Sequence, residues 1–407
     1  MFERRLNEVV RATFAALTLV AVGAAAPRAA YAAEPLKIGV LTDMSGPIAD
    51  MVGQGSVTAV KLAVEDFGGS VLGRPIEVVS GDHQNKGDIA AGIARRWFDR
   101  EGVEAITDLA VSVTAGIVQD IAAKSNKIAL ISGSGSLDLF GKNCTSTGFV
   151  WTFDTDVLPR TTVDGVTRRL GSKSWFFIVP DYSFGKQMVA AANEEIKRTG
   201  GRFVGSVATP VGTADFASPL IEAQSSRSDI VAFSLGGHDF LNAMKQAVEF
   251  NLPEKQRLAT IFTTITDVHA IGQSLVKNIV LSTPFYWDLD DDTRNFSKRF
   301  FDRMNRYPNM IQAGDYSSVM HYLKAVRAAG ATDGAAVAAK MHELPVSDLT
   351  LKNGRIRPDG RVMRDMYLMR VKTPEESKYP WDYYEVLERF AAKEVMSETP
   401  SSSCPLK

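Results

Sequence analysis

The chain has 407 residues, of which 46 Lys and Arg nearly balance 47 Asp and Glu for a formal net charge of −1. This length is too great for one ordinary hydrophobic core and suits two lobes. Near neutrality without a long basic run argues against a nucleic-acid or anionic-membrane partner, so we expect the partner to be a small molecule or a protein.

The first 32 residues have the pattern of a secretory signal peptide. Arg4, Arg5 and Arg11 precede or border an uncharged apolar run over 12–26. Ala30-Tyr31-Ala32 then places small residues at the two positions that signal peptidase reads. The run is too short to span a membrane, although an uncleaved anchor is the alternative. We predict cleavage after Ala32 and export to a bacterial periplasm.

Short apolar segments alternate with amphipathic ones from residue 36 onward. Val57, Val60, Val64 and Phe67, for example, recur at helical spacing. This βαβα order predicts a mostly parallel sheet with helices on both faces. The segments that we interpret as its buried strands are Leu36–Leu41, Ile76–Val79, Ala105–Leu109 and Ile128–Ile131.

The same pattern then repeats, which predicts a second lobe of the same kind. Its expected strands are Trp175–Val179, Phe203–Thr209, Ile230–Ser234, Leu258–Phe262 and Asn278–Leu281. Three segments are candidate crossovers between the lobes: 149–153, 281–285 and 344–346. The stretch Arg355–Val371, with Arg357-Pro358-Asp359-Gly360 at its turn, predicts a hairpin.

These crossovers divide the chain into discontinuous lobes. We expect residues 34–154 plus 284–345 to form the N-terminal lobe, and 155–283 plus 346–389 the C-terminal lobe. Residues 390–407 are expected to return to the N-terminal lobe as a tail. A chain that crosses repeatedly between two α/β lobes makes a hinged cleft.

Ligands of open parallel sheets bind outside the carboxyl ends of the strands, so the loops after the strands are the candidate site. In the first lobe, Ser112 and Thr114 follow one strand, and Ser134 and Ser136 follow the next within Ser132-Gly133-Ser134-Gly135-Ser136. Backbone N–H groups with serine hydroxyls beside them suit a carboxylate. The alternative is that these residues only cap helices and ease turns.

The second lobe contributes aromatic and charged candidates. Tyr182 or Phe184 could close over a flat or apolar ligand body, or pack within the lobe. His238, after two glycines, could donate to an anion. Asp267 could hold an ammonium group or cap the next helix, and these two interpretations stay open.

Cys144 and Cys404 are the only cysteines of the chain. In an oxidising compartment we expect them to form a disulfide that ties the tail to the middle of the chain; two free thiols are the alternative. Neither has a neighbouring Cys or His at ligand spacing, so no metal site is predicted, and no cofactor.

Four segments together resemble the leucine/isoleucine/valine-type periplasmic substrate-binding proteins of ABC transporters. They are Gly39–Pro47, the loop 132–136, the turn Asp181–Gly185, and Gly314-Asp315-Tyr316-Ser317-Ser318 before a helix. The resemblance implies a type I periplasmic binding fold, in which two lobes joined by three crossovers close on a ligand and present it to a membrane permease.

The resemblance also implies roles for individual residues. The loop 111–114, with Ser134 and Ser136, would hold a ligand carboxylate, and Phe184 would pack on the ligand where many members have tyrosine. Asp267 falls about where amino-acid binders keep an acidic residue. Phe285-Tyr286-Trp287-Asp288 and the 321–326 helix resemble a branch that takes up aromatic acids.

We therefore expect a monomeric receptor of an ABC importer, not an enzyme, that captures a small carboxylate. An aromatic acid is the first expectation for the ligand, and a branched-chain or other apolar amino acid is the alternative. A hydrolase or lyase on the same scaffold is an alternative of another class. A ligand-sensing receptor ectodomain is disfavoured because no transmembrane segment follows.

Overall fold

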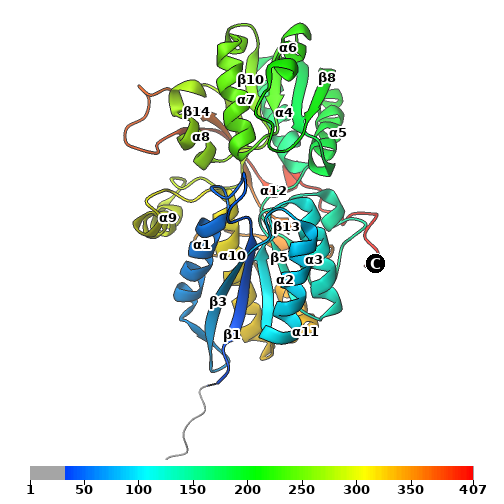
Figure 1. Cartoon of the computed structure of the whole chain (residues 1–407), viewed down its shortest axis with the longest axis vertical. Helices are drawn as coiled ribbons and strands as arrows, with labels where there is room; N and C mark the ends of the chain where they lie inside the picture. The colour runs from blue at the N-terminus through cyan, green and yellow to red at the C-terminus, as the bar shows by residue number, and fades with distance from the viewer. Residues whose placement is uncertain (1–32, 407) are drawn as a thin grey trace, which may run out of the picture. The chain divides into compact units, whose positions relative to one another are not determined.

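The computed structural model describes residues 33–406, so the predicted signal peptide lies outside the described residues. Two α/β lobes, each built on its own sheet, make up this part of the chain (Figure 1). Across residues 33–406, no helix has the length and apolar character needed to cross a membrane.

The first lobe has a six-stranded sheet in the order β2-β3-β1-β4-β5-β6. All pairs are parallel except the short antiparallel pair of β2 with β3. The strands are β1 (Leu36–Thr42), β2 (Ser70–Val71), β3 (Arg74–Asp82), β4 (Val103–Asp108), β5 (Ile128–Ile131) and β6 (Gly148–Val150).

Helices cover both faces of this sheet. α1 packs with α10 on one face and α2 with α3 on the other (Figure 1). The helices of this lobe are α1 (Gly53–Phe67), α2 (Gly87–Arg96) with a π-helical turn (Trp97–Glu101), α3 (Ser112–Lys124), α9 (Asp291–Met304), α10 (Met310–Ala329) and α11 (Gly334–Glu343), with a 3-10 turn at Leu137–Leu139.

The second lobe has a seven-stranded sheet in the order β15-β14-β11-β10-β9-β7-β8. β14 pairs antiparallel with both β15 and β11, and all other pairs are parallel. The strands are β7 (Ser174–Pro180), β8 (Arg202–Thr209), β9 (Ile230–Phe233), β10 (Arg257–Thr260), β11 (Val280–Thr283), β14 (Met366–Val371) and β15 (Tyr384–Phe390).

The helices of the second lobe pack as α4 with α5 and as α7 with both α6 and α8. They are α4 (Val157–Leu170), α5 (Ser183–Arg198), α6 (Ala217–Ser225), α7 (Gly237–Glu249), α8 (Ile265–Ile271) and α12 (Ala392–Val395), with 3-10 turns at Leu252–Glu254 and Gln273–Leu275. The predicted α/β class with two mostly parallel lobes is confirmed.

Every predicted strand is present, with ends that differ by a few residues. Three strands are not among those predicted from the sequence: the short β2, β6, whose residues overlap the first candidate crossover, and β15, whose charged residues hide its pattern. The predicted hairpin is β12 (Arg355–Ile356) with β13 (Val362–Met363), closed by the Gly360 N–H donating to Arg357 O at 2.9 Å.

The hairpin β12–β13 lies against the first lobe. The Val150 N–H of β6 donates to Gly360 O at 3.0 Å, and Arg361 pairs with Asp154 at 2.6 Å. After the hairpin the chain returns to the second sheet at β14. The domain boundaries given above remain predictions.

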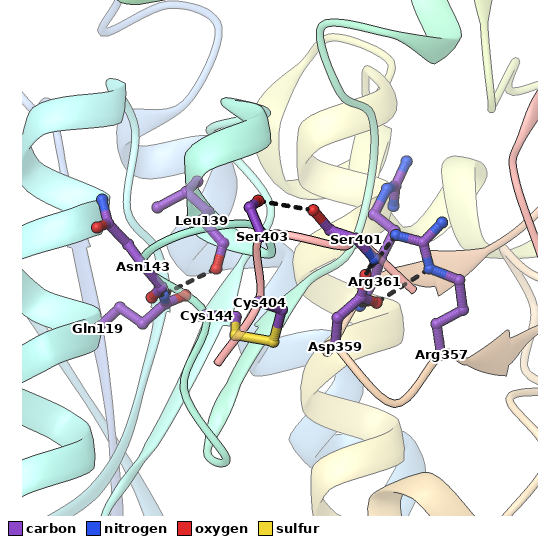
Figure 2. The surroundings of a disulfide bond; sticks show 10 residues. All are labelled: Gln119, Leu139, Asn143, Cys144, Arg357, Asp359, Arg361, Ser401, Ser403 and Cys404. Carbon is purple, nitrogen blue, oxygen red and sulfur yellow. Dashed lines mark hydrogen bonds and ion pairs between the residues drawn. A yellow bond between two sulfur atoms is a disulfide. The ribbon is translucent and has the colours of Figure 1, made fainter. Parts of the chain in front are cut away.

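The predicted disulfide between Cys144 and Cys404 is present, with the two Cα atoms 5.6 Å apart (Figure 2). The tail that carries Cys404 is also held by the Ser401 N–H, which donates to Asp359 at 2.8 Å. On the other side of the bridge, the Gln119 amide donates to Leu139 O at 2.9 Å and orders the loop before Cys144. The end of the tail is thus fastened to the loop that carries Cys144 and to the turn that carries Asp359.

Candidate functional site

A cavity of about 1070 Å³ lies at the carboxyl ends of both sheets and is lined by residues from both lobes. This is where a parallel α/β sheet places its ligand, and its size is at the upper end of the range for small-molecule sites. The first lobe supplies the loops after β1, β4 and β5, together with Phe153. The second supplies the loops after β7 and β9, together with Phe262.

Ser112 and Ser134 face each other on the first-lobe wall, with their hydroxyl oxygens 3.4 Å apart. Both line the cavity, and Ser134 is only 3% exposed. The loop after β5 packs closely against Phe153 because it contains Gly135, where a Cβ would lie 2.7 Å from Phe153 O. Two hydroxyls beside the first turn of α3 can bind an anion without an arginine.

The loop that leads into α3 has a strained backbone. Asp108, Leu109 and Val111 have φ values of 74°, 56° and 69°, a region that residues with a Cβ rarely adopt. Beneath this loop the Asp108 side chain is fully buried, and burial raises its pKa to about 6. Backbone strain of this kind collects at ligand sites, where the surrounding structure maintains it.

Two of the predicted anion-binding hydroxyls are engaged within the protein. The Thr114 hydroxyl donates to Val111 O at 2.8 Å, and Thr114 is not among the cavity-lining residues. Ser136 does line the cavity, but its hydroxyl donates to the side chain of Gln187 at 3.1 Å. The carboxylate-binding potential of the first lobe therefore rests mainly on Ser112 and Ser134.

Both predicted aromatic residues line the cavity. Tyr182 stacks on Phe184, with ring centroids 5.8 Å apart. Phe184 also contacts Phe262 at 5.3 Å and Phe153 at 6.4 Å, both edge-on. Phe184 is buried and Tyr182 half-buried. Together the four rings form an apolar wall that suits a branched or aromatic side chain.

The other two second-lobe candidates lie outside the cavity lining. His238 is exposed, and its backbone N–H points to Pro47 O at 3.4 Å. Asp267 is 3% exposed and is engaged as the third residue of a capping box on α8. One of its oxygens accepts the Gly237 N–H at 2.9 Å and the other the Thr264 N–H at 2.8 Å. The hydrogen bonds of Asp267 are therefore those of a helix cap, which was the alternative to holding an ammonium group.

Asp239 is the cavity residue that the sequence interpretation missed. Its carboxylate lines the cavity, is 6% exposed, and accepts the Gly212 N–H at 3.0 Å from each oxygen. Burial raises the pKa of Asp239. The other two lining carboxylates, Asp120 and Asp138, pair with lysines one turn later, whereas no Lys or Arg of residues 33–406 pairs with Asp239.

A helical phase explains why Asp239 was missed. His238 and Asp239 are neighbours in the first turn of α7, and successive side chains differ by about 100° around a helix. Only the packing of α7 against the sheet decides which of the two faces the cavity.

The described residues contain no candidate metal site. Residues 33–406 bring no three His, Cys, Asp or Glu side chains into a group that could hold an ion.

Two α/β lobes with a cavity at their strand ends provide a site for a small ligand. Residues 35–378 match the family described as periplasmic binding protein, and the chain belongs to that family. It is a solute-binding protein of an ABC transporter, a receptor and not an enzyme, which sets aside the hydrolase alternative. No curated protein matches the chain.

Solved structures agree with this family. A periplasmic binding protein from Burkholderia mallei is 41% identical, with a TM-score of 0.88, over 92% of this chain and 99% of that one. A branched-chain amino acid ABC transporter periplasmic ligand-binding protein from Burkholderia xenovorans is 39% identical, with a TM-score of 0.82, over 90% and 99%. A solute-binding protein from Rhodopseudomonas palustris in complex with benzoate is 19% identical, with a TM-score of 0.78, over 91% and 98%, and shares the fold alone.

Proposed function

We propose that the ligand is an apolar amino acid, with Asp239 as the counter-charge of its ammonium group. This replaces the aromatic acid that was the first expectation from the sequence. The observation that carries the proposal is the Asp239 carboxylate, which lines the cavity, accepts the Gly212 N–H and pairs with no Lys or Arg among residues 33–406. A buried ammonium requires such a partner, because an unpaired buried charge is costly.

The rest of the cavity fits the same ligand. Ser112 and Ser134 would donate hydrogen bonds to the ligand carboxylate at the start of α3, and the Tyr182–Phe184 wall would cover the apolar side chain. The 39% identical Burkholderia xenovorans protein, named for branched-chain amino acids, supports this choice. We further propose that the receptor is exported through cleavage after Ala32 and delivers its ligand to a membrane permease.

An aromatic monocarboxylate is the second candidate, because four aromatic rings line or support the cavity wall. On that hypothesis Asp239 has no role in recognition. Removing its negative charge would leave the binding of benzoate unchanged or strengthen it.

Calorimetric titration with L-leucine, its deaminated analogue 4-methylpentanoate, and benzoate separates the two. We expect L-leucine to bind at least about 100-fold more tightly than 4-methylpentanoate, and Asp239→Asn to remove most of that preference, because breaking a buried charge pair costs about 3–5 kcal/mol.

Two variants serve as controls for Asp239→Asn. Asp138→Asn changes a lining carboxylate that already pairs with Lys142, at 3.1 Å, and should leave the preference intact. Asp267→Asn should lower stability because it weakens the cap of α8, but it should keep the preference for L-leucine over 4-methylpentanoate. Tight benzoate binding together with indifference to Asp239→Asn would establish the aromatic acid instead.

A further inference from the structure

Gln187 connects three segments of the chain beside the cavity. It lies in the second turn of α5, in the second lobe, and its side-chain oxygen accepts three hydrogen bonds. The donors are the Ser136 hydroxyl at 3.1 Å, the Leu137 N–H at 3.0 Å and the Thr155 hydroxyl at 2.9 Å. Ser136 and Leu137 follow β5 of the first lobe, and Thr155 lies in the segment between β6 and α4 that leads into the second lobe.

These bonds give the two serines of the loop different tasks. A serine hydroxyl has one proton to donate. Ser136 donates its proton to Gln187, and its oxygen accepts the Asp138 N–H at 3.3 Å. Ser136 therefore cannot donate to a ligand carboxylate while this bond is made. Ser134, whose hydroxyl has only the long 3.4 Å contact with Ser112, remains available for the ligand.

The crossover is joined to the same loop. The Thr155 N–H donates to Gly135 O at 2.9 Å, so residues 134–137 are attached to the crossover by backbone as well as through Gln187. Gln187 itself is not among the cavity-lining residues. Any influence on the ligand must pass through the loop that it holds.

We propose that Gln187 is a positioning residue for ligand retention: it fastens the 134–137 loop to the second lobe in the closed receptor and slows ligand release without touching the ligand. The proposal rests on the proposed function, since it presumes a receptor that closes on a ligand. Because the bonds join different lobes, they favour the closed state over the open one in the ligand-free protein as well as in the complex, and a ligand leaves from the open state.

The test compares three variants on one helix. Gln187→Met keeps the length of the side chain but removes the oxygen acceptor, whereas Gln187→Glu keeps an oxygen acceptor for all three donors. Asn193→Met is the matched control, because Asn193 is a partly exposed amide of α5 whose side chain makes no hydrogen bond within residues 33–406. L-leucine is the probe, and its dissociation and association rate constants are measured by stopped-flow tryptophan fluorescence.

We expect Gln187→Met to release L-leucine about tenfold faster with a nearly unchanged association rate, as the net loss of neutral hydrogen bonds implies. Gln187→Glu should restore slow release to within about threefold. Equal release rates for Gln187→Met and Asn193→Met would overturn the proposal. A uniform loss of stability that Gln187→Glu does not rescue would also overturn it, since that outcome marks a structural role.

A second readout does not depend on the ligand. The Leu137 amide donates to Gln187 and has no other acceptor within residues 33–406, so its hydrogen exchange in the ligand-free protein reports this contact directly. We expect about tenfold faster exchange of this amide in Gln187→Met than in Asn193→Met. Unchanged exchange would overturn the proposal. Failure of L-leucine to bind the parent would instead contradict the amino-acid ligand and leave this second test in force.

Discussion

Asp239 and Asp267 show how single side chains divide between recognition and structure. Both are acidic, both lie in the first turn of a helix after a strand of the second lobe, and burial raises the pKa of both. Asp267 accepts hydrogen bonds from Gly237 and Thr264 and so completes its own cap. Asp239 accepts the Gly212 N–H and pairs with no Lys or Arg of residues 33–406, which leaves it capacity for a ligand.

Asp108 gives a pH dependence at the scale of one residue. Neither of its carboxylate oxygens has a hydrogen-bond partner within residues 33–406, and burial raises its pKa to about 6. The folded protein thus holds this proton more tightly than the unfolded chain does. The contribution of Asp108 to stability is therefore fully present below about pH 4 and is lost as the pH rises through about 6.

We expect Asp108→Asn to gain roughly 1–3 kcal/mol of unfolding free energy relative to the parent between about pH 4 and pH 7. Urea unfolding at three pH values in that window measures the difference. Asp120→Asn, at an exposed carboxylate that pairs with Lys124, is the control. Its unfolding free energy should change with pH in the same way as that of the parent. Parallel curves for Asp108→Asn as well would mean that the buried carboxyl does not titrate in this range.

At the scale of an element, the C-terminal tail is held by the Cys144–Cys404 bridge and by Ser401 on Asp359 (Figure 2). Asp359 also receives two hydrogen bonds from Arg357, at 2.9 and 2.6 Å, so the tail rests on the turn of the β12–β13 hairpin. The bridge closes a loop with a sequence separation of 260 residues, and long loops gain most from a cross-link in the chain-entropy account.

We expect Cys404→Ser to lower the unfolding free energy by about 2–5 kcal/mol. Ser403→Ala, next to the bridge, removes only the hydroxyl contact with Ser401 at 2.9 Å and should cost far less. Titration of the denatured parent with a thiol reagent should find no free thiol. Two free thiols would show that the bridge does not form in the exported protein.

At the scale of the whole molecule, one ion pair joins two of the connections between the lobes. Arg361, from the β12–β13 hairpin, is 1% exposed and donates to Asp154 in the first crossover at 2.6 Å. Asp154 also accepts the N–H of Val157, the first residue of α4, at 2.7 Å. The pair therefore fixes the crossover from which the second lobe begins.

We expect Arg361→Met to lower the unfolding free energy by about 3–5 kcal/mol, because it leaves Asp154 buried without a counter-charge. Arg355→Met is the control on the same hairpin: its pair with Glu398 is exposed and should contribute at most about 1 kcal/mol. Thermal and urea unfolding of both variants provide the comparison. Equal losses of unfolding free energy in the two variants would show that the buried Arg361–Asp154 pair stabilises the protein no more than the exposed Arg355–Glu398 pair.

The sequence by itself determined the two α/β lobes, the strand-end loops, the disulfide partners and the receptor family. Each of these follows from local periodicity, from the count of two cysteines, or from the order of short motifs along the chain. The tertiary structure alone showed that Asp239 and not His238 faces the cavity, that Asp267 serves a cap, and that Ser136 is bound to Gln187. These outcomes depend on the phase of a helix and on contacts between residues far apart in sequence, neither of which a local pattern contains.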